Sequence, residues 1–385
     1  MDNNSQLSMF SDPLRGNNDI EKDSKRNAVY LIALSNLDGV GFSTIKTLFD
    51  SYEGDFSNIW NNSKDEVYKY LQSSKIPNSF IVSNSIYSLS KEDLKVAENQ
   101  YEILKYNRSI NIVFKNSAEY PQSLYDLPHP PTWLFIQGDS RIVHDPAIIG
   151  VVGTRTPTPM GLDSAQRLSV DLARGGFYIL SGLAEGIDAM GHQVAVDFDI
   201  PTIAVLGHGL DIIFPASTSI LRQEIIERGG AVISEYLLKD TYARERFVQR
   251  NRIQVALSRA VAVIEGKQKS GTAHTVRFAK QVKRPLFGAC IGDILQIPQH
   301  ELLIDLIRQS YPVFDIGNQD NRNNLRTFLS NLVPKDQRKY SHGKPHLFKG
   351  LIKEVIRLSE NYDANHNDFS WLIDQISNYR DGRSQ

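Results

Sequence analysis

Six short runs of β-branched and other apolar residues recur along the middle of the chain, and their starts lie 24 to 30 residues apart. The runs are 148–152, 177–180, 202–206, 231–234, 261–264 and 285–287. Segments typical of helices fill the intervals, among them 162–174, 188–196, 219–228 and 273–282. Because continuous apolar strands that alternate with helices form a parallel sheet covered on both faces, the pattern predicts an α/β fold with a doubly wound parallel sheet. Ligands of such sheets bind beyond the carboxyl ends of the strands, so a site is expected in the loops that follow them.

The flanking segments predict further parts of the chain, whose 385 residues allow about two or three domains. The polar residues 1–24 are expected to form a flexible lead-in. Residues 25–107 show helical spacing, and the turn Asp38-Gly39-Val40-Gly41 is similar to a helix-hairpin-helix, although a plain helix–turn–helix packing unit fits equally well. The sheet domain is placed at 108–298, and residues 299–385 are expected to form a helical C-terminal region of unknown role. Its predicted helices are 301–308, 324–332, 348–358 and 369–379.

Charge is distributed unevenly along the chain. The whole sequence carries 43 Lys and Arg against 44 Asp and Glu, a formal charge of −1. The segment 239–284 holds twelve Lys and Arg and three acids, so it carries +9 and the remainder carries −10. A basic block is typical of a phosphate-binding surface, although a solvated helix face gives the same pattern. Here the basic residues alternate with apolar ones inside the predicted sheet domain, which favours a shaped site.

Several classes of protein are excluded by composition. One cysteine, Cys290, leaves no internal disulfide and no multi-cysteine zinc cluster. No apolar run approaches the roughly 18 residues that a membrane span needs, and the start of the chain has no signal-peptide pattern. We therefore expect a cytoplasmic protein with no membrane partner. No metal or cofactor is expected, and the absence of G-x-G-x-x-G after the first strand argues against a nicotinamide or flavin site.

The loops after the first two predicted strands suit an anion. Arg155 lies in the first, where small hydroxyl residues and free backbone amides precede a helix. Gly182 lies in the second, in a stretch of small residues that allows close backbone approach. Asp188 and His192 follow at i, i+4 spacing and could share a helix face as a catalytic dyad, but a structural or phosphate-facing histidine is favoured.

A basic segment that contains an aromatic residue follows the fourth strand: Arg244, Arg246, Phe247, Arg250, Asn251 and Arg252. Arginines supply bidentate phosphate contacts, Asn251 can read a base edge, and Phe247 offers a stacking surface. This combination is typical of single-stranded nucleic-acid binding. In the alternative interpretation Phe247 belongs to the core and one arginine pairs with Glu235 or Glu265.

A second basic loop follows the fifth strand. Its Gly266 and Gly271 have the glycine spacing of a P-loop, but Thr272 stands where the P-loop lysine belongs, so an ATPase is disfavoured. A basic loop that ends at a helix start still suits a phosphate or a nucleic-acid backbone. The loop residues assigned to this role are Lys267, Lys269, Ser270 and Gly271.

Taken in order, these motifs resemble a known family. They are Val152-Gly153-Thr154-Arg155, Ser181-Gly182-Leu183-Ala184-Glu185-Gly186-Ile187-Asp188, Gly209-Leu210-Asp211, Ser234-Glu235-Tyr236, Phe247-x-x-Arg250-Asn251-Arg252 and Lys269-Ser270-Gly271. The series is similar to the DNA-processing protein A (DprA/Smf) family over roughly residues 111–290. One departure is Glu185, which stands where the family usually has arginine.

The resemblance implies an extended Rossmann-like domain that binds single-stranded DNA, forms a homodimer and helps to load a RecA-type recombinase. Carried over by motif, the implied DNA pocket comprises Arg155, Gly182, Arg244, Phe247, Arg250, Asn251 and Lys269. The basic segments add Arg252, Lys267, Ser270 and Gly271 to the predicted site.

The predicted function is therefore that of a non-enzymatic protein that protects single-stranded DNA and assists a recombinase in recombination or DNA uptake, as in natural transformation. One alternative is a nucleotide-ligand sensor, or a phosphoribohydrolase-like enzyme on the same fold. The enzyme needs a glutamate where Thr275 stands. Another alternative is a DNA-linked component of a defence or mobile-element system.

Overall fold

The computed structural model describes residues 17–292, 294 and 300–338. The helices predicted at 348–358 and 369–379 lie outside these residues. The chain divides into two compact units, each described here by itself. The N-terminal unit holds the described residues up to 137 together with 208–211 and 234–241, and the sheet unit holds 138–207, 212–233 and the residues from 242 on. The domain boundaries predicted at 107 and 298 divide the chain differently and stay predictions.

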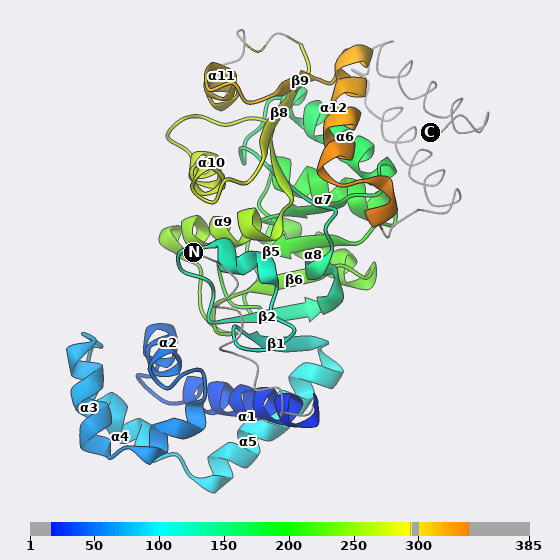
Figure 1. Ribbon diagram of the computed structural model, residues 1–385. Coiled ribbons are helices and arrows are strands. Elements are labelled where there is room, and N and C mark those ends of the chain that lie inside the picture. Colours follow the sequence, from blue (N-terminus) through cyan, green and yellow to red (C-terminus); the bar gives the residue numbers. More distant parts are fainter. Residues whose placement is uncertain (1–16, 293, 295–299, 339–385) are drawn as a thin grey trace, which may run out of the picture. The chain divides into compact units, whose positions relative to one another are not determined.

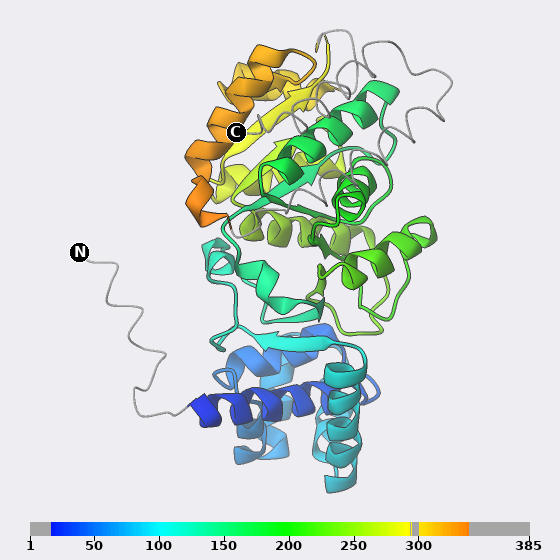
Figure 2. The same cartoon turned by 90° about the vertical axis from the view of Figure 1, so that its right-hand side faces the viewer.

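Helices dominate the N-terminal unit, as the apolar spacing predicts. They are α1 (Asn17–Ser35), α2 (Phe42–Ser51), α3 (Lys64–Ser73), α4 (Ser79–Tyr87) and α5 (Lys91–Glu102). Figure 2 shows α1, in dark blue, crossing the cyan α5 against which it packs. Residues 17–24 of the predicted lead-in are helical and belong to α1, and the flexibility of the lead-in stays a prediction. Among the side chains described in α1, burial begins only at Asn27 and Ala28, so the polar first turns carry no apolar period that would reveal a helix.

A β-hairpin that the sequence reasoning did not single out completes this unit. Strands β1 (Ile110–Phe114) and β2 (Trp133–Gly138) pair antiparallel, with Phe114 opposite Trp133. Phe49 of α2 lies 5.3 Å from Phe114, centroid to centroid, in a stacked arrangement. Aromatic packing of this kind joins the hairpin to the helices of the unit.

The turn between α1 and α2 requires a glycine at one of its two glycine positions, Gly39. Gly39 has φ +78°, a left-handed conformation that disfavours side chains. A methyl group at Gly41 would meet no atom within 4 Å. Val40 between them is buried. The segment is a packed helix–turn–helix, and its use as a DNA-binding hairpin stays a prediction.

The sheet unit confirms the predicted doubly wound parallel sheet (Figure 1). Its strands are β3 (Ile148–Val152), β4 (Tyr178–Ser181), β5 (Thr202–Val205), β6 (Ala231–Ser234), β7 (Ala260–Val263), β8 (Leu286–Cys290) and β9 (Val313–Asp315). They lie in the order β6-β5-β4-β3-β7-β8-β9, and every pairing between neighbours is parallel. The chain runs outward from β3 to β6, then returns to start again at β7 beside β3. The switch point therefore lies between β3 and β7.

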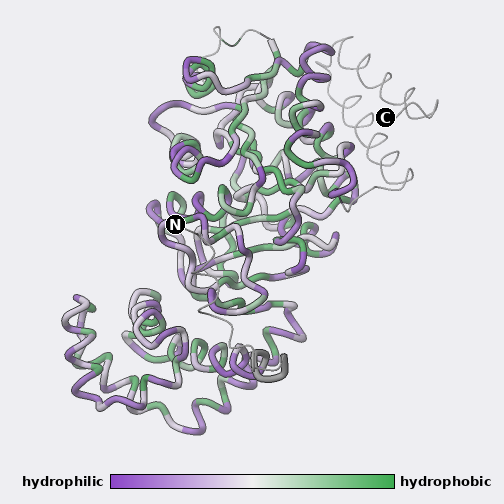
Figure 3. Tube along the Cα trace, viewed as in Figure 1, coloured by the Kyte–Doolittle hydropathy of each residue, from purple (hydrophilic) through white to green (hydrophobic). Residues whose placement is uncertain are grey.

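Helices cover both faces of this sheet, as Figure 1 shows. One face carries α9 (Arg244–Leu257), α10 (Gly271–Gln281) and α11 (Glu301–Arg308). The other carries α6 (Pro159–Arg174), α7 (Ile187–Asp197), α8 (Ser219–Glu227) and α12 (Gln319–Leu332). Figure 3 shows the strands as a predominantly hydrophobic layer. Burial on both faces explains why these strands appear in the sequence as continuous apolar runs.

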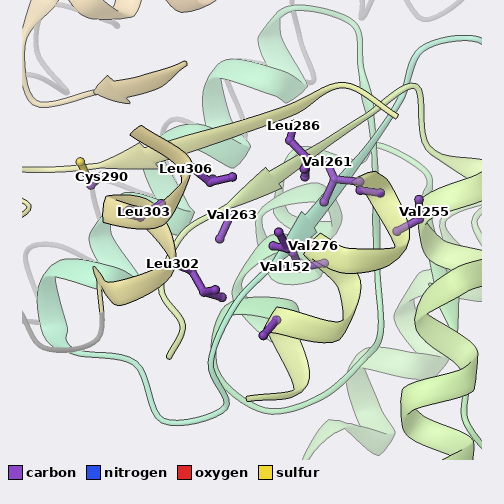
Figure 4. Close-up of a cluster of buried hydrophobic side chains, with 12 residues drawn as sticks. Val152, Val255, Val261, Val263, Val276, Leu286, Cys290, Leu302, Leu303 and Leu306 are labelled. Carbon is purple, nitrogen blue, oxygen red and sulfur yellow. The ribbon is translucent and has the colours of Figure 1, made fainter. Parts of the chain in front are cut away.

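One part of the core joins β3, β7 and β8 to the helices on the first face (Figure 4). The strands contribute Val152, Val261, Val263, Leu286 and Cys290, and the helices contribute Val255, Ala273, Val276, Ala279, Leu302, Leu303 and Leu306. Each of these side chains is at least nine-tenths buried. The only cysteine, Cys290, is one of them, and burial raises the pKa of its thiol to about 12.

The prediction of helices alone after residue 298 is wrong at one point. Strand β9 lies between α11 and α12 and extends the sheet beside β8, with Phe314 opposite Ala289. At three residues it is too short to produce a period of its own in the sequence. On the opposite face, Arg322 of α12 holds Asp171 of α6 through bonds of 2.8 and 3.0 Å, with both side chains buried. Across residues 17–292, 294 and 300–338, none of the helices combines the length and the apolar character needed to cross a bilayer.

Candidate nucleic-acid interface

The loops after β3 and β4 are packed against each other at the carboxyl end of the sheet. The amide of Ile187 donates to the carbonyl of Thr154 at 3.3 Å. Gly186 has φ +78°, and a Cβ at this position would lie 2.6 Å from the Thr154 carbonyl oxygen and 2.8 Å from backbone atoms of Arg155. Glycine is therefore required here both by conformation and by space. The contact fixes the backbone that carries Arg155, whose side chain is exposed.

Arg250 is the structural centre of this region. Although it was predicted to contact DNA, its side chain is only 4% exposed. Nη1 donates to the carbonyl of Gly182 at 2.7 Å and also to the carbonyl of Val205. These carbonyls belong to the ends of β4 and β5, so one guanidinium links two strand ends to α9. A Cβ at Gly182 would lie 2.5 Å from the guanidinium nitrogens, which explains the glycine there.

Asn251 has a similar structural role. It is 7% exposed, and its side-chain amide donates to the carbonyl of Gly271 at 3.2 Å. Gly271 is the first residue of α10. The bond therefore joins α9 to the loop that carries Lys267 and Lys269.

Asp188 and His192 lie in the interior. His192 Nδ1 is 2.9 Å from the hydroxyl of Thr202, and burial, with a contribution from the charge of Arg250, lowers the pKa of His192 to about 3. Burial also raises the pKa of Asp188, against the opposing effect of Arg250. The Asp188 carboxylate accepts the amide of Gly182 at 3.1 Å. His192 is therefore a structural histidine, one of the two roles that the sequence favours over a catalytic dyad.

Three aromatic rings cluster in the sheet unit at the start of α9. Phe214 and Tyr242 are stacked, with centroids 3.9 Å apart and planes 24° apart. Phe247 lies 5.7 Å from Phe214 and 6.3 Å from Tyr242. The guanidinium of Arg155 lies 5.0 Å from the centroid of the Phe247 ring, within the range of a cation–π contact. The structure thus brings together Arg155 and Phe247, two of the predicted site residues.

Phe214 and Tyr242 are members of this cluster that the sequence reasoning missed. The available signal was two aromatic residues in polar loops, one after the third predicted strand and one just before the basic segment. Separation by 28 positions in sequence hid their stacking, because no local pattern links the two loops.

The remaining predicted residues lie on the loops and helices of the α9–α10 side. Arg244 at the start of α9 is exposed, as are Lys267 and Lys269 in the second basic loop, whereas Arg252 is half-buried. The Ser270 hydroxyl caps α10 by accepting the amide of Ala273 at 3.3 Å. Gly271 is exposed, and a Cβ there would meet nothing within 4 Å.

His274 extends this cationic surface on α10 and was not predicted. Its ring Nδ1 lies 2.6 Å from Nη2 of Arg277, one turn further along the helix. Partial burial lowers the pKa of His274, and the positive charges of Arg277 and Arg244 lower it further. Positively charged side chains from both α9 and α10 thus lie near His274, an arrangement suited to an anion.

Two acids also lie near these loops. Glu185 is exposed and accepts the hydroxyl of Ser217 at 2.6 Å. Glu265 at the end of β7 is fully buried and accepts the backbone amide of Thr158 at 2.9 Å, which ties the strand to the start of α6. Among the residues that the structure describes, no group of three or more His, Cys, Asp and Glu is placed to hold a metal ion.

Comparisons with known proteins agree with the resemblance seen in the sequence. A family model described as DNA recombination-mediator protein A matches residues 111–301. The DNA processing protein DprA of Bacillus subtilis is 30% identical over 223 residues, which are 55% of this chain and 75% of that protein. Protein Smf of a Synechocystis species is 37% identical over 196 residues, or 49% of this chain and 48% of Smf. The chain thus spans about half the length of this Smf protein.

Solved structures show the same similarity. The X-ray structure of DNA processing protein A from Streptococcus pneumoniae superposes with a TM-score of 0.58 at 25% identity, covering 75% of this chain and 94% of that one. A structure of DNA processing protein A from Helicobacter pylori, described as giving insight into its single-stranded DNA binding mode, has a TM-score of 0.51 at 27% identity. It covers 58% of this chain and 97% of that one.

Proposed function

The chain belongs to the DNA recombination-mediator protein A family, known as DprA or Smf, and from this premise we propose that it binds single-stranded DNA at the carboxyl end of its parallel sheet. The observation that carries the proposal is the juxtaposition of Arg155 with an aromatic cluster that is only partly buried. Duplex DNA hides its base faces, whereas a single strand presents both phosphates and base faces. Cations bind phosphates and aromatic rings stack on bases, so this combination matches a single strand.

The proposed contacts fall into two groups. Exposed cations bind the phosphate backbone, namely Arg155, Arg244, Lys267 and Lys269, and Phe247 contributes an aromatic surface. Arg250, Asn251 and Gly182 act as positioning residues, because their polar groups are buried and bonded to carbonyls of neighbouring loops. Ser270 and Gly271 shape the start of α10, and Arg252 is a half-buried residue of α9.

The same proposal covers the wider role. We propose that the chain protects single-stranded DNA, acts in recombination or DNA uptake with a RecA-type recombinase, forms a homodimer and works in the cytoplasm without catalysing a reaction. The family membership supports these assignments. These assignments depend on single-stranded DNA binding, which is therefore tested first.

The test is a binding titration by fluorescence anisotropy with a labelled oligothymidylate and a duplex of the same length. We expect tighter binding of the single strand. Log affinity should fall linearly with log salt, by about 0.7 for each phosphate neutralised. Arg244→Ala and Lys269→Ala should each weaken binding and reduce that slope, whereas Arg308→Ala, an exposed arginine of α11, should leave both unchanged.

The proposal fails if single and double strands bind equally or not at all. It also fails if a mononucleotide raises the melting temperature and an oligonucleotide does not, because that result identifies a nucleotide sensor.

A further inference from the structure

The aromatic cluster contains one ring with an open face. Tyr242 is stacked on Phe214 at 3.9 Å, so one of its faces is covered. The side chain is nevertheless 49% exposed. Phe247 lies 6.3 Å from Tyr242, and the three centroid distances place it on the same side of the ring as Phe214. Both neighbouring rings therefore lie on one side of Tyr242, and its exposure points to the other face and the ring edge. Tyr242 therefore presents a free aromatic surface that is held from behind.

Phe247, the ring predicted from the sequence to stack on bases, is more enclosed. Arg155 lies over it at 5.0 Å, and Phe214 lies 5.7 Å away. Its backbone side is pressed against Gly207, where a Cβ would lie 2.7 Å from the Phe247 ring. A base can reach this ring only where Arg155 or Phe214 leaves room. The more open stacking surface of the cluster is therefore that of Tyr242.

The surroundings of Tyr242 suit a nucleotide. It lies two residues before Arg244, an exposed arginine at the start of α9. Adjacent phosphates in an extended single strand are separated by one base, so an aromatic ring beside an exposed cation can receive a base and its phosphate together. Stacking on Phe214 also fixes the ring, which lowers the entropy lost when a base binds.

We propose that the open face of Tyr242 is a base-stacking position for single-stranded DNA, with Phe214 as the support that holds the ring in place. This deepens the proposed function and rests on it. The occupant is an unpaired nucleobase, and any of the four bases fits because each has a π-face.

Four variants separate stacking from packing. Tyr242→Ala removes the ring, and Tyr242→Leu keeps apolar bulk against Phe214 but has no π-face. Tyr242→Phe and Tyr242→Trp keep a face. Removing one stacked base contact costs about 1–3 kcal/mol by alanine substitution, so the Ala and Leu variants should bind an oligothymidylate about 5- to 150-fold more weakly. The Phe and Trp variants should bind within about twofold of the unsubstituted chain, a margin of about 0.4 kcal/mol.

An abasic oligonucleotide of the same length supplies a readout that a merely structural role would not move. It keeps the phosphates and lacks base faces, so Tyr242→Ala and the unsubstituted chain should bind it equally. Tyr106→Ala is the matched control, because Tyr106 is 69% exposed and lies in the N-terminal unit. Its affinity for both oligonucleotides should be unchanged.

The outcomes are distinguishable. Tyr242→Leu binding oligothymidylate as tightly as the unsubstituted chain overturns the stacking position and leaves the proposed function standing. Equal losses on the abasic and the normal strand overturn it as well, because the effect is then structural. If the unsubstituted chain binds no oligonucleotide at all, the proposed function is overturned and this inference with it.

Discussion

Replacing the buried Arg250 by methionine should lower the free energy of unfolding. Methionine keeps most of the aliphatic length but removes the charge and the donors. The carbonyls of Gly182 and Val205 then lose a charged donor inside the protein. A hydrogen bond to a charged group contributes about 1.5–3 kcal/mol, and breaking a buried charged contact on one side costs about 3–5 kcal/mol. Because these contributions overlap, we expect a loss of about 3–5 kcal/mol in the free energy of unfolding.

The charge of Arg250 also acts on the buried carboxylate of Asp188. Burial raises the pKa of this acid and Arg250 opposes the rise. A raised folded pKa means that the folded state favours the protonated acid. Stability from this group is therefore greatest below the unfolded pKa of 3.8 and is lost as the pH rises through the folded pKa. Without Arg250 the folded pKa rises further, so Arg250→Met should destabilise the chain more at pH 7.5 than at pH 5.

The assay is urea unfolding followed by circular dichroism at both pH values, together with Asp188→Asn and the double variant. Asp188→Asn removes the charge that Arg250 offsets. The double variant should therefore lose less stability than the sum of the two single losses, with a coupling of about 0.5–3 kcal/mol. A loss below about 1 kcal/mol for Arg250→Met would refute this reasoning. If Arg250→Met kept its stability but lost most of its oligonucleotide affinity, Arg250 would be a direct ligand of DNA and not a positioning residue.

Three further outcomes follow from other contacts. Gly182→Ala should lower the free energy of unfolding in urea by about 1–3 kcal/mol, because its Cβ would press on the buried guanidinium of Arg250. Gly271→Ala is the control: its Cβ would have no neighbour within 4 Å, so the change should be less than about 0.5 kcal/mol. A phosphate beside His274 should raise the lowered pKa of this histidine, so oligonucleotide affinity should rise as the pH falls from 7.5 towards 5.5. The same dependence of affinity on pH in His274→Gln would contradict this. Arg322→Met should lower the free energy of unfolding in urea by about 1.5–3 kcal/mol, because Asp171 loses its bidentate partner but keeps Arg326 at 3.2 Å. A loss under about 1 kcal/mol would contradict that role.

The positions of most strands were predictable because the sheet is buried on both faces. A strand in that setting needs apolar residues at nearly every position, and such runs stand out in any sequence. The predicted runs at 148–152 and 231–234 match β3 and β6 residue for residue. Strands β1 and β2 contain apolar runs as well, but they escaped prediction because they pair antiparallel and no α-helix separates them. Strand β9 escaped because it has only three residues.

The candidate site was predictable as a region but not as a set of contacts. The basic residues of 239–284 and the loops after the strands pointed to the carboxyl end of the sheet. The first two turns of α9 carry arginines on the exposed and the buried side alike, so their spacing shows no preferred face. Arg244 is exposed and Arg250 is buried, although the sequence pattern predicts both as phosphate ligands.

The sequence by itself determined the class of fold and indicated the region and chemistry of a candidate site, because periodicity, the alternation of strands and helices, and charge are local properties of the chain. Only the tertiary structure decided which charged side chain supports the site and which one faces solvent. It also decided that Phe214 and Tyr242, from separate loops, share one stack. The physical reason is that burial and stacking depend on neighbours brought together by the sheet, and a residue's own sequence surroundings do not contain those neighbours.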